Sequence, residues 1–129
     1  MRTFAIGDVH GCYTALTALL EALQLQDDDQ LVFLGDLVDR GPDSFRVVER
    51  VRELVDSDRA VCLLGNHEEM LLSAQDDPSD LMFWMQVGGA AALRSYKTGT
   101  GTMTTTDIRQ IKSEDKVVTP KATGTCQGK

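Results

Sequence analysis

The sequence predicts an α/β fold in which a parallel sheet is built from alternating strands and helices. Three apolar segments, residues 2–6, 31–34 and 60–64, are too short for helices and are typical of buried strands. Two longer segments between them, residues 13–25 and 45–55, have the apolar spacing of amphipathic helices. This βαβαβ order favours parallel strands joined by right-handed crossovers. We therefore expect the carboxyl ends of all three strands to share one edge of the sheet.

The two helical segments are assigned from the spacing of their apolar residues. In the first, four leucines fall at the i, i+3, i+4 and i+7 positions of one buried face: Leu16, Leu19, Leu20 and Leu23. In the second, the apolar stripe consists of Val47, Val48, Val51, Leu54 and Val55. Pro42 precedes this helix, and Asp43 or Ser44 is expected to be its N-cap.

Beyond the third strand the sequence predicts shorter helices over residues 68–73, 80–87 and 90–96, with a break at Gly88-Gly89. Glu68 and Glu69 are expected to complement the dipole of the first of these helices. The large apolar residues of this region are expected to belong to the core rather than to a recognition surface. They are Met70, Met82, Phe83, Trp84 and Met85.

Composition and charge narrow the classes of function. The net charge of −7 argues against general binding to nucleic acid or to an anionic membrane, because both require positive charge. No apolar run approaches the ~18 residues of a membrane span. The three cysteines form no paired framework, which indicates a reducing compartment. We therefore expect a cytoplasmic protein that binds neither nucleic acid nor membrane.

The composition changes abruptly at residue 97, which divides the chain into residues 1–96 and a tail of residues 97–129. All five lysines lie in the tail and every leucine lies before it. The first part carries seven basic and seventeen acidic residues, whereas the tail carries six basic and three acidic ones. We interpret the tail as disordered or non-native, following an interruption of the natural sequence. An ordinary polar C-terminus and a basic binding tail are the alternatives.

Three polar motifs follow the three predicted strands and contain both histidines of the sequence. They are GDVHG (residues 7–11), GDLVDRG (35–41) and GNHE (65–68). Carboxylate, imidazole and amide oxygen groups are ligands for Mn, Fe, Zn or Mg. They favour a site for such a cation over a structural zinc site made of cysteine thiolates. The candidate metal ligands are Asp8, His10, Asp36 and Asn66.

The same motifs offer groups for hydrolysis of a phosphate ester. Asp36, on the middle strand, is placed to bridge two cations that activate water and neutralise phosphoryl charge. His67 is the candidate acid for the leaving group, with Asp39 orienting its ring. Arg40 provides a planar donor group for phosphate oxygens, and Asn66 is a second candidate substrate contact.

These motifs, in this order and spacing, resemble the signature of the calcineurin-like metallophosphoesterase superfamily. Within it, they are similar to the bacterial and phage phosphoprotein (serine/threonine) phosphatases. The resemblance covers residues 1–96 and includes Trp84 with Gly88-Gly89. It implies two divalent metal ions, with Asp8 and His10 on the first, Asp36 bridging and Asn66 on the second. It also implies that His67 is the general acid, Asp39 its partner and Arg40 a phosphate contact.

The chain departs from the family pattern where the second metal site should be completed. Family members supply two further histidines there, whereas this sequence has none after His67. The resemblance therefore implies a truncated N-terminal half of a four-layer α/β sandwich, with its second sheet missing or incomplete. The apolar strands would then have one uncovered face, and we expect self-association through it.

Three functions follow from these interpretations. The first is hydrolysis of phosphate monoesters by a dinuclear metal centre, with phosphoserine or phosphothreonine as the expected substrate. The second is hydrolysis of dinucleoside polyphosphates, a small phosphate-ester substrate. The third is a truncated, inactive chain that binds at most one metal ion.

Overall fold

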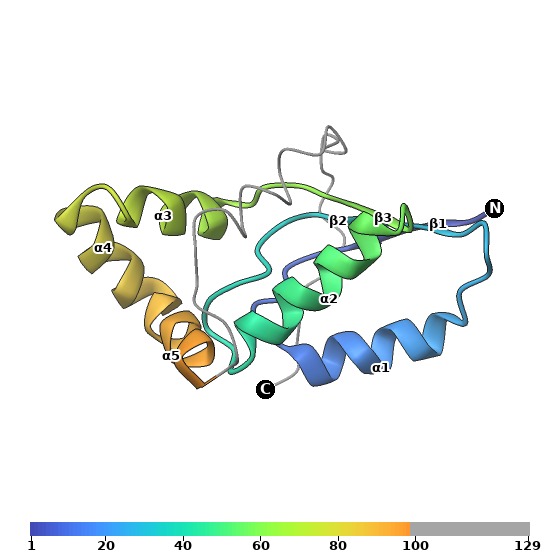
Figure 1. Ribbon diagram of the computed structural model, residues 1–129, viewed down its shortest axis with the longest axis horizontal. Helices are drawn as coiled ribbons and strands as arrows, with labels where there is room; N and C mark the ends of the chain where they lie inside the picture. The colour runs from blue at the N-terminus through green and yellow to red at the C-terminus, as the bar shows by residue number, and fades with distance from the viewer. Residues whose placement is uncertain (99–129) are drawn as a thin grey trace.

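The computed structural model describes residues 1–98, so most of the tail expected at residues 97–129 lies outside the described residues. The elements follow the predicted order (Figure 1). In chain order they are β1 (Thr3–Ile6), α1 (Tyr13–Leu23), β2 (Gln30–Phe33), α2 (Ser44–Asp56), β3 (Ala60–Cys62), α3 (Asn66–Ala74), α4 (Pro78–Trp84), the π-helical turn η1 (Met85–Gly89) and α5 (Ala90–Thr98). The proposed boundary at residue 97 falls within α5.

The three strands form a parallel sheet in the order β1-β2-β3, which confirms the predicted α/β fold. Phe4 pairs with Leu31, and Phe33 pairs with Cys62. Successive strands are neighbours and both connections are crossovers of the same kind, so α1 and α2 lie on the same side of the sheet (Figure 1). No helix within residues 1–98 is both long enough and apolar enough to cross a bilayer.

The core lies between the sheet and helices α1 and α2. Alternate strand residues face these helices, and Leu31, Phe33 and Cys62 are at most 1% exposed. The intervening residues form the opposite face, where Ala5 is exposed and Val32 and Val61 are only half-buried. Their lower burial agrees with an α/β layer that is covered by helices on one side.

Helices α3, α4 and α5 form a second group beside the carboxyl ends of the strands (Figure 1). Helix α5 returns to α2, where the rings of Tyr96 and Phe45 meet edge to face at 5.1 Å. The Phe45 N–H also donates to Ser95 Oγ at 2.9 Å. These contacts connect the last described helix to the βαβαβ unit.

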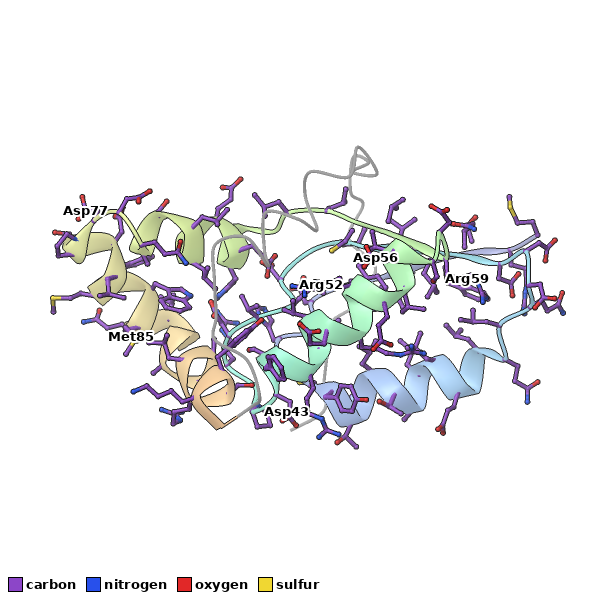
Figure 2. All side chains as sticks on the ribbon, viewed as in Figure 1. Asp43, Arg52, Asp56, Arg59, Asp77 and Met85 are labelled. Atoms are coloured by element: carbon purple, nitrogen blue, oxygen red, sulfur yellow. The ribbon has the colours of Figure 1, made fainter. Side chains whose placement is uncertain are left out.

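Capping residues and a glycine break mark the ends of the helices. Asp43 is the N-cap residue of α2, as expected, although its side chain makes no capping hydrogen bond. Asp77 caps α4 with its side chain, accepting from Ser79 N at 2.7 Å. Figure 2 shows Asp43 and Asp56 at the two ends of α2 and Asp77 at the start of α4. The predicted break is also present, because Gly88 has a φ of +125°.

One expectation about α4 is wrong. The large apolar residues of this region were expected to form core, and Trp84 does, at 2% exposure. Met82 and Phe83, in contrast, are 65% and 57% exposed. Three consecutive apolar residues on a seven-residue helix cannot all face inward, and the inward position belongs to Trp84.

Candidate metal centre and active site

The carboxyl ends of β1 and β2 bring Asp8, His10 and Asp36 together. One ligand atom from each of these residues lies within 4.8 Å of those from the other two. The backbone holds the two loops side by side, since His10 N donates to Asp36 O at 2.9 Å and Gly11 N donates to Leu37 O at 2.8 Å. Two carboxylates and an imidazole at this spacing are a suitable ligand set for a divalent cation.

The loops around this cluster have an unusual backbone conformation. Five residues proposed from the sequence as site residues have positive φ: Asp8 (39°), His10 (45°), Asp36 (52°), Asp39 (77°) and Arg40 (71°). Such conformations cost free energy for residues other than glycine and persist only where surrounding contacts hold them. The strain is therefore concentrated at the strand ends where the candidate ligands lie.

Glycine is required where the second and third motifs meet. A Cβ added at Gly65 would lie 2.3 Å from Asp36 Oδ1, and one added at Gly35 would lie 2.4 Å from Gly65 N. Both distances are shorter than any real contact, so a side chain at either position would push the two loops apart. The close approach positions the third motif against Asp36.

Asn66 lies against the carboxylate of Asp36, which agrees with a shared metal site. In one orientation its side-chain amide nitrogen donates to the two Asp36 oxygens at 3.1 and 3.0 Å. An Asn66 that bound a metal ion would instead turn its amide oxygen toward the ion, which is the opposite assignment of the same two atoms. His67 N also donates to Asp36 Oδ1 at 2.9 Å. These hydrogen bonds hold α3 against Asp36, and the ligand atoms that fit a divalent ion are those of Asp8, His10 and Asp36.

The two histidines of the sequence are neighbours at the site. Their rings meet edge to face, with centroids 4.6 Å apart and an interplanar angle of 80°. Nδ1 of His10 lies 2.8 Å from Val38 O, so it carries the proton that this carbonyl accepts. This hydrogen bond leaves Nε2 of His10 as the nitrogen that can bind a metal.

Asp39 and His67 form a buried pair. Nδ1 of His67 donates to Asp39 Oδ2 across 2.8 Å, and neither side chain is more than 5% exposed. Burial raises the pKa of the Asp39 carboxyl, while hydrogen bonds from His67 and Trp84 oppose that rise. Nε2 of His67 makes no hydrogen bond to any residue in the described part of the chain.

Two residues of the site were missed as site residues by the interpretation of the sequence. Trp84 was assigned to the core, yet its Nε1 donates to Asp39 Oδ2 at 2.7 Å. Glu68 was expected only to complement a helix dipole, yet it is 3% exposed and reaches back to the loop after β2. Its place as the third residue of α3, after Gly65, is the signal of a capping residue. No sequence signal links it to the preceding motif.

Glu68 accepts hydrogen bonds from two motifs at once. Its Oε1 accepts from Asp36 N at 2.6 Å and Gly65 N at 2.9 Å. Its Oε2 accepts from Leu37 N at 2.8 Å and Val38 N at 3.3 Å. Burial, with the nearby charge of Asp36, raises the pKa of Glu68 to about 7, and the backbone hydrogen bonds oppose this.

Arg40 lies at the edge of the site. Its side chain is exposed, and its Nε donates to Val87 O at 3.4 Å. The described contacts of this side chain are with the turn around Gly88 rather than with the cluster of Asp8, His10 and Asp36. Its contact with phosphate stays a prediction.

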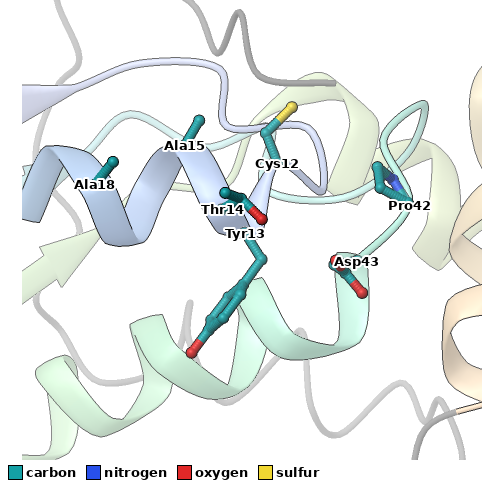
Figure 3. Close-up of a pocket in the computed structure, with 7 residues that line it drawn as sticks. All are labelled: Cys12, Tyr13, Thr14, Ala15, Ala18, Pro42 and Asp43. Atoms are coloured by element: carbon teal, nitrogen blue, oxygen red, sulfur yellow. The ribbon is translucent and has the colours of Figure 1, made fainter.

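Besides a hollow lined by Arg40, Pro42, Ala91, Arg94 and Ser95, two others lie near the motifs. One, between α3 and α4, has a volume of about 320 Å³ and is lined by Asn66, Glu69, Met70, Ser73, Asp80 and Phe83. The other, of about 270 Å³, lies at the start of α1, with Pro42 and Asp43 on its far side (Figure 3). Only the first is lined by a candidate ligand, which is Asn66.

The comparisons with known proteins agree with this geometry. Residues 1–122 match the Calcineurin-like phosphoesterase family, and the chain belongs to that family. A crystal structure of a metallophosphoesterase from Sphaerobacter thermophilus has the same fold, with a TM-score of 0.56 and 24% identity over 88% of this chain and 40% of that one. The family implies divalent metal ions, and Asp8, His10 and Asp36 provide part of the ligand set.

The curated relatives favour one of the alternatives considered above. A symmetrical bis(5'-nucleosyl)-tetraphosphatase of Erwinia tasmaniensis is 50% identical over 74 residues, which are 57% of this chain and 26% of that protein. One of Nitrosospira multiformis is 42% identical over 82 residues, which are 63% of this chain and 29% of that protein. Neither name is that of a phosphoprotein phosphatase. The chain spans about a quarter of the length of these relatives.

Proposed function

We propose that the chain is the metal-binding and proton-donating part of a phosphoesterase that hydrolyses dinucleoside polyphosphates. The observation that carries the proposal is the convergence of Asp8, His10 and Asp36 beside the buried pair of His67 and Asp39. The names of the curated relatives support the dinucleotide as substrate in preference to a phosphoprotein.

The metal ions would be held by the ligands that the strand ends bring together. Asp8 and His10 would hold the first ion, Asp36 would contact both, and Asn66 would contribute to the second. When bound, such ions supply a nucleophile at neutral pH and neutralise charge on the phosphoryl group. The sequence has only two histidines, so the second ion would have fewer proposed protein ligands, Asp36 and Asn66, than the first.

His67 would protonate the leaving oxygen of the substrate. Its Nδ1–H is held by Asp39, so the proton at Nε2 is the one available for transfer. After the transfer the imidazole is neutral and still donates from Nδ1 to Asp39. Burial of both side chains keeps water from competing for this hydrogen bond.

The hollow beside Asn66 offers room for the nucleoside of such a substrate. Asn66 and Ser73 lie seven residues apart on α3, or about 10 Å along its axis. Exposed Phe83 provides a ring against which a base can stack. Glu69 and Asp80 provide acceptors for the amino group of a base.

The test measures metal binding and substrate choice on the full 129-residue chain. Calorimetric titration with Mn²⁺ should show binding that Asp36→Asn weakens about 100-fold. Asp56→Asn, an exposed aspartate at the end of α2, is the matched control and should bind as the parent does. Unchanged Mn²⁺ affinity in Asp36→Asn would contradict the metal site.

Substrate choice is tested with diadenosine tetraphosphate, a phosphothreonine peptide and 4-nitrophenyl phosphate at equal concentration. We expect Mn²⁺-dependent hydrolysis of the dinucleotide to exceed that of the peptide. Faster hydrolysis of the peptide would favour the phosphatase function. Metal binding without turnover of any of the three would indicate that the chain is inactive by itself.

A further inference from the structure

We propose that Trp84 is a positioning residue that acts on His67 through Asp39. The turn after Trp84 also helps to hold Asp39 in place. The inference rests on the proposed function in one respect, which is the assignment of His67 as the proton donor. It concerns the orientation of that donor and is independent of which phosphate ester is the substrate.

The side-chain evidence is that two donors converge on one carboxylate oxygen. Asp39 Oδ2 accepts from Trp84 Nε1 at 2.7 Å and from His67 Nδ1 at 2.8 Å. All three side chains are buried, and Asp39 is completely so. Because the two donors come from different helices, Asp39 cannot rotate its carboxylate without losing both hydrogen bonds. The hydrogen bond from Trp84 therefore fixes the orientation of Asp39 Oδ2 toward the imidazole of His67.

The other oxygen of this carboxylate, Oδ1, does not hold its orientation. Asp39 Oδ1 is buried and has no hydrogen-bond partner among the described residues. Without the indole N–H, Oδ2 would keep a single donor and the carboxylate would be free to turn about its side-chain bonds. The orientation of His67 would then depend on packing alone.

The backbone turn at Gly88-Gly89, after Trp84, packs against both Asp39 and Trp84. Arg40 N donates to Gly88 O at 3.0 Å, next to Asp39. A Cβ added at Gly88 would lie 2.6 Å from Arg40 Cγ, and one added at Gly89 would lie 2.3 Å from the Trp84 ring. The turn is therefore packed closely against the positive-φ backbone of Asp39 and Arg40, and against Trp84 itself.

A purely structural tryptophan would not need its N–H, and this difference can be tested. Trp84→Phe keeps an aromatic ring in the core and removes the donor. The measured quantity is the ratio of kcat for phenyl phosphate to kcat for 4-nitrophenyl phosphate, with Mn²⁺. Phenolate is the poorer leaving group and depends more on protonation, so poor alignment of His67 should lower this ratio about tenfold. Met82→Leu, on the exposed side of the same helix, should leave the ratio unchanged.

A second measurement needs no turnover. Trp84 is the only tryptophan in the sequence, so the ¹H–¹⁵N spectrum of the chain contains one indole signal. A hydrogen bond to a buried carboxylate predicts a downfield, slowly exchanging indole proton, which should move upfield and exchange faster in Asp39→Asn. Asp56→Asn should leave the signal in place.

The outcomes separate this inference from the proposed function. An indole signal that Asp39→Asn does not move would overturn it, whether or not the chain is active. An equal loss of activity toward both aryl phosphates in folded Trp84→Phe would also overturn it, because that result describes a structural role. Failure to hydrolyse diadenosine tetraphosphate would count against the substrate alone, since neither aryl phosphate contains a nucleoside.

Discussion

The carboxylate of Glu68 accepts a hydrogen bond of 2.6 Å from the backbone N–H of Asp36, which lies 32 residues earlier in the chain. The same side chain also bonds to Gly65 N, at the start of its own helix. One buried carboxylate therefore fixes the distance between the motif after β2 and the motif after β3. The position of Asp36 relative to Asn66 depends on this link.

Replacing Glu68 with glutamine should destabilise the chain by about 3 kcal/mol. A glutamine has one acceptor oxygen, and its NH₂ group would face backbone N–H groups that then lack a partner. Urea unfolding followed by circular dichroism measures the change. Glu69→Gln, one residue away and exposed, is the matched control and should differ from the parent by less than about 0.5 kcal/mol. Equal urea midpoints for the two variants would show that the hydrogen bonds of Glu68 contribute little to the free energy of unfolding.

The ion pair of Arg2 and Asp29 predicts a loss of stability in acid. Asp29 is 1% exposed, and hydrogen bonds from Arg2 hold the pKa of its carboxyl below the ordinary value of 3.8. A carboxyl with a lowered folded-state pKa stabilises the fold above its unfolded pKa. That contribution is lost as pH falls below about 4, because protonation then favours the unfolded chain.

Asp29→Asn should therefore be less stable than the parent at pH 7, and this difference should shrink steadily below pH 4. Urea unfolding at a series of pH values measures it. Asp28→Asn, whose side chain is 65% exposed, should follow the parent curve throughout. A constant difference between Asp29→Asn and the parent from pH 7 to pH 2 would be inconsistent with the lowered pKa.

Phe83 is expected to contribute to binding of the nucleoside. Its ring is exposed and lines the hollow next to Asn66. Phe83→Ala should raise the KM for diadenosine tetraphosphate about tenfold through loss of stacking, with little change in KM for 4-nitrophenyl phosphate. Met82→Ala removes a similarly exposed side chain that is not among those lining the hollow, and should leave both values unchanged. A rise in KM for both substrates in Phe83→Ala would argue against a base subsite.

The face of the sheet that no helix of residues 1–98 covers is expected to cause self-association. Val32 lies in the middle of the central strand on this face and is half-buried. Val32→Thr should weaken concentration-dependent association in sedimentation velocity while retaining a β-branched residue in the strand. Ala22→Thr, an exposed position on α1, serves as the control. A parent chain whose sedimentation coefficient does not change with concentration would show that the face is not an association surface.

Much of the fold could be predicted because its local patterns agree with one another. Leu16 and Leu20 are buried on one face of α1, and the stripe of α2 from Val47 to Val55 is buried as its spacing predicts. The prediction for α1 was wrong at Leu19, which is 40% exposed although its spacing placed it on the same buried face. The region after β3 was less predictable. Phe83 and Trp84 are adjacent aromatic residues, and only the packing of α4 decides that one is exposed and the other is buried.

The sequence alone determined the order of the elements and the chemical groups at the ends of the strands. Periodicity places the strands, and a parallel sheet must bring their carboxyl ends to one edge, so Asp8, His10 and Asp36 were expected to meet. Only the tertiary structure decided how those groups are held. The hydrogen bonds from Trp84 to Asp39 and from Asp36 to Glu68 span 45 and 32 residues. Contacts over such distances depend on how the helices pack, and local sequence patterns do not report that packing.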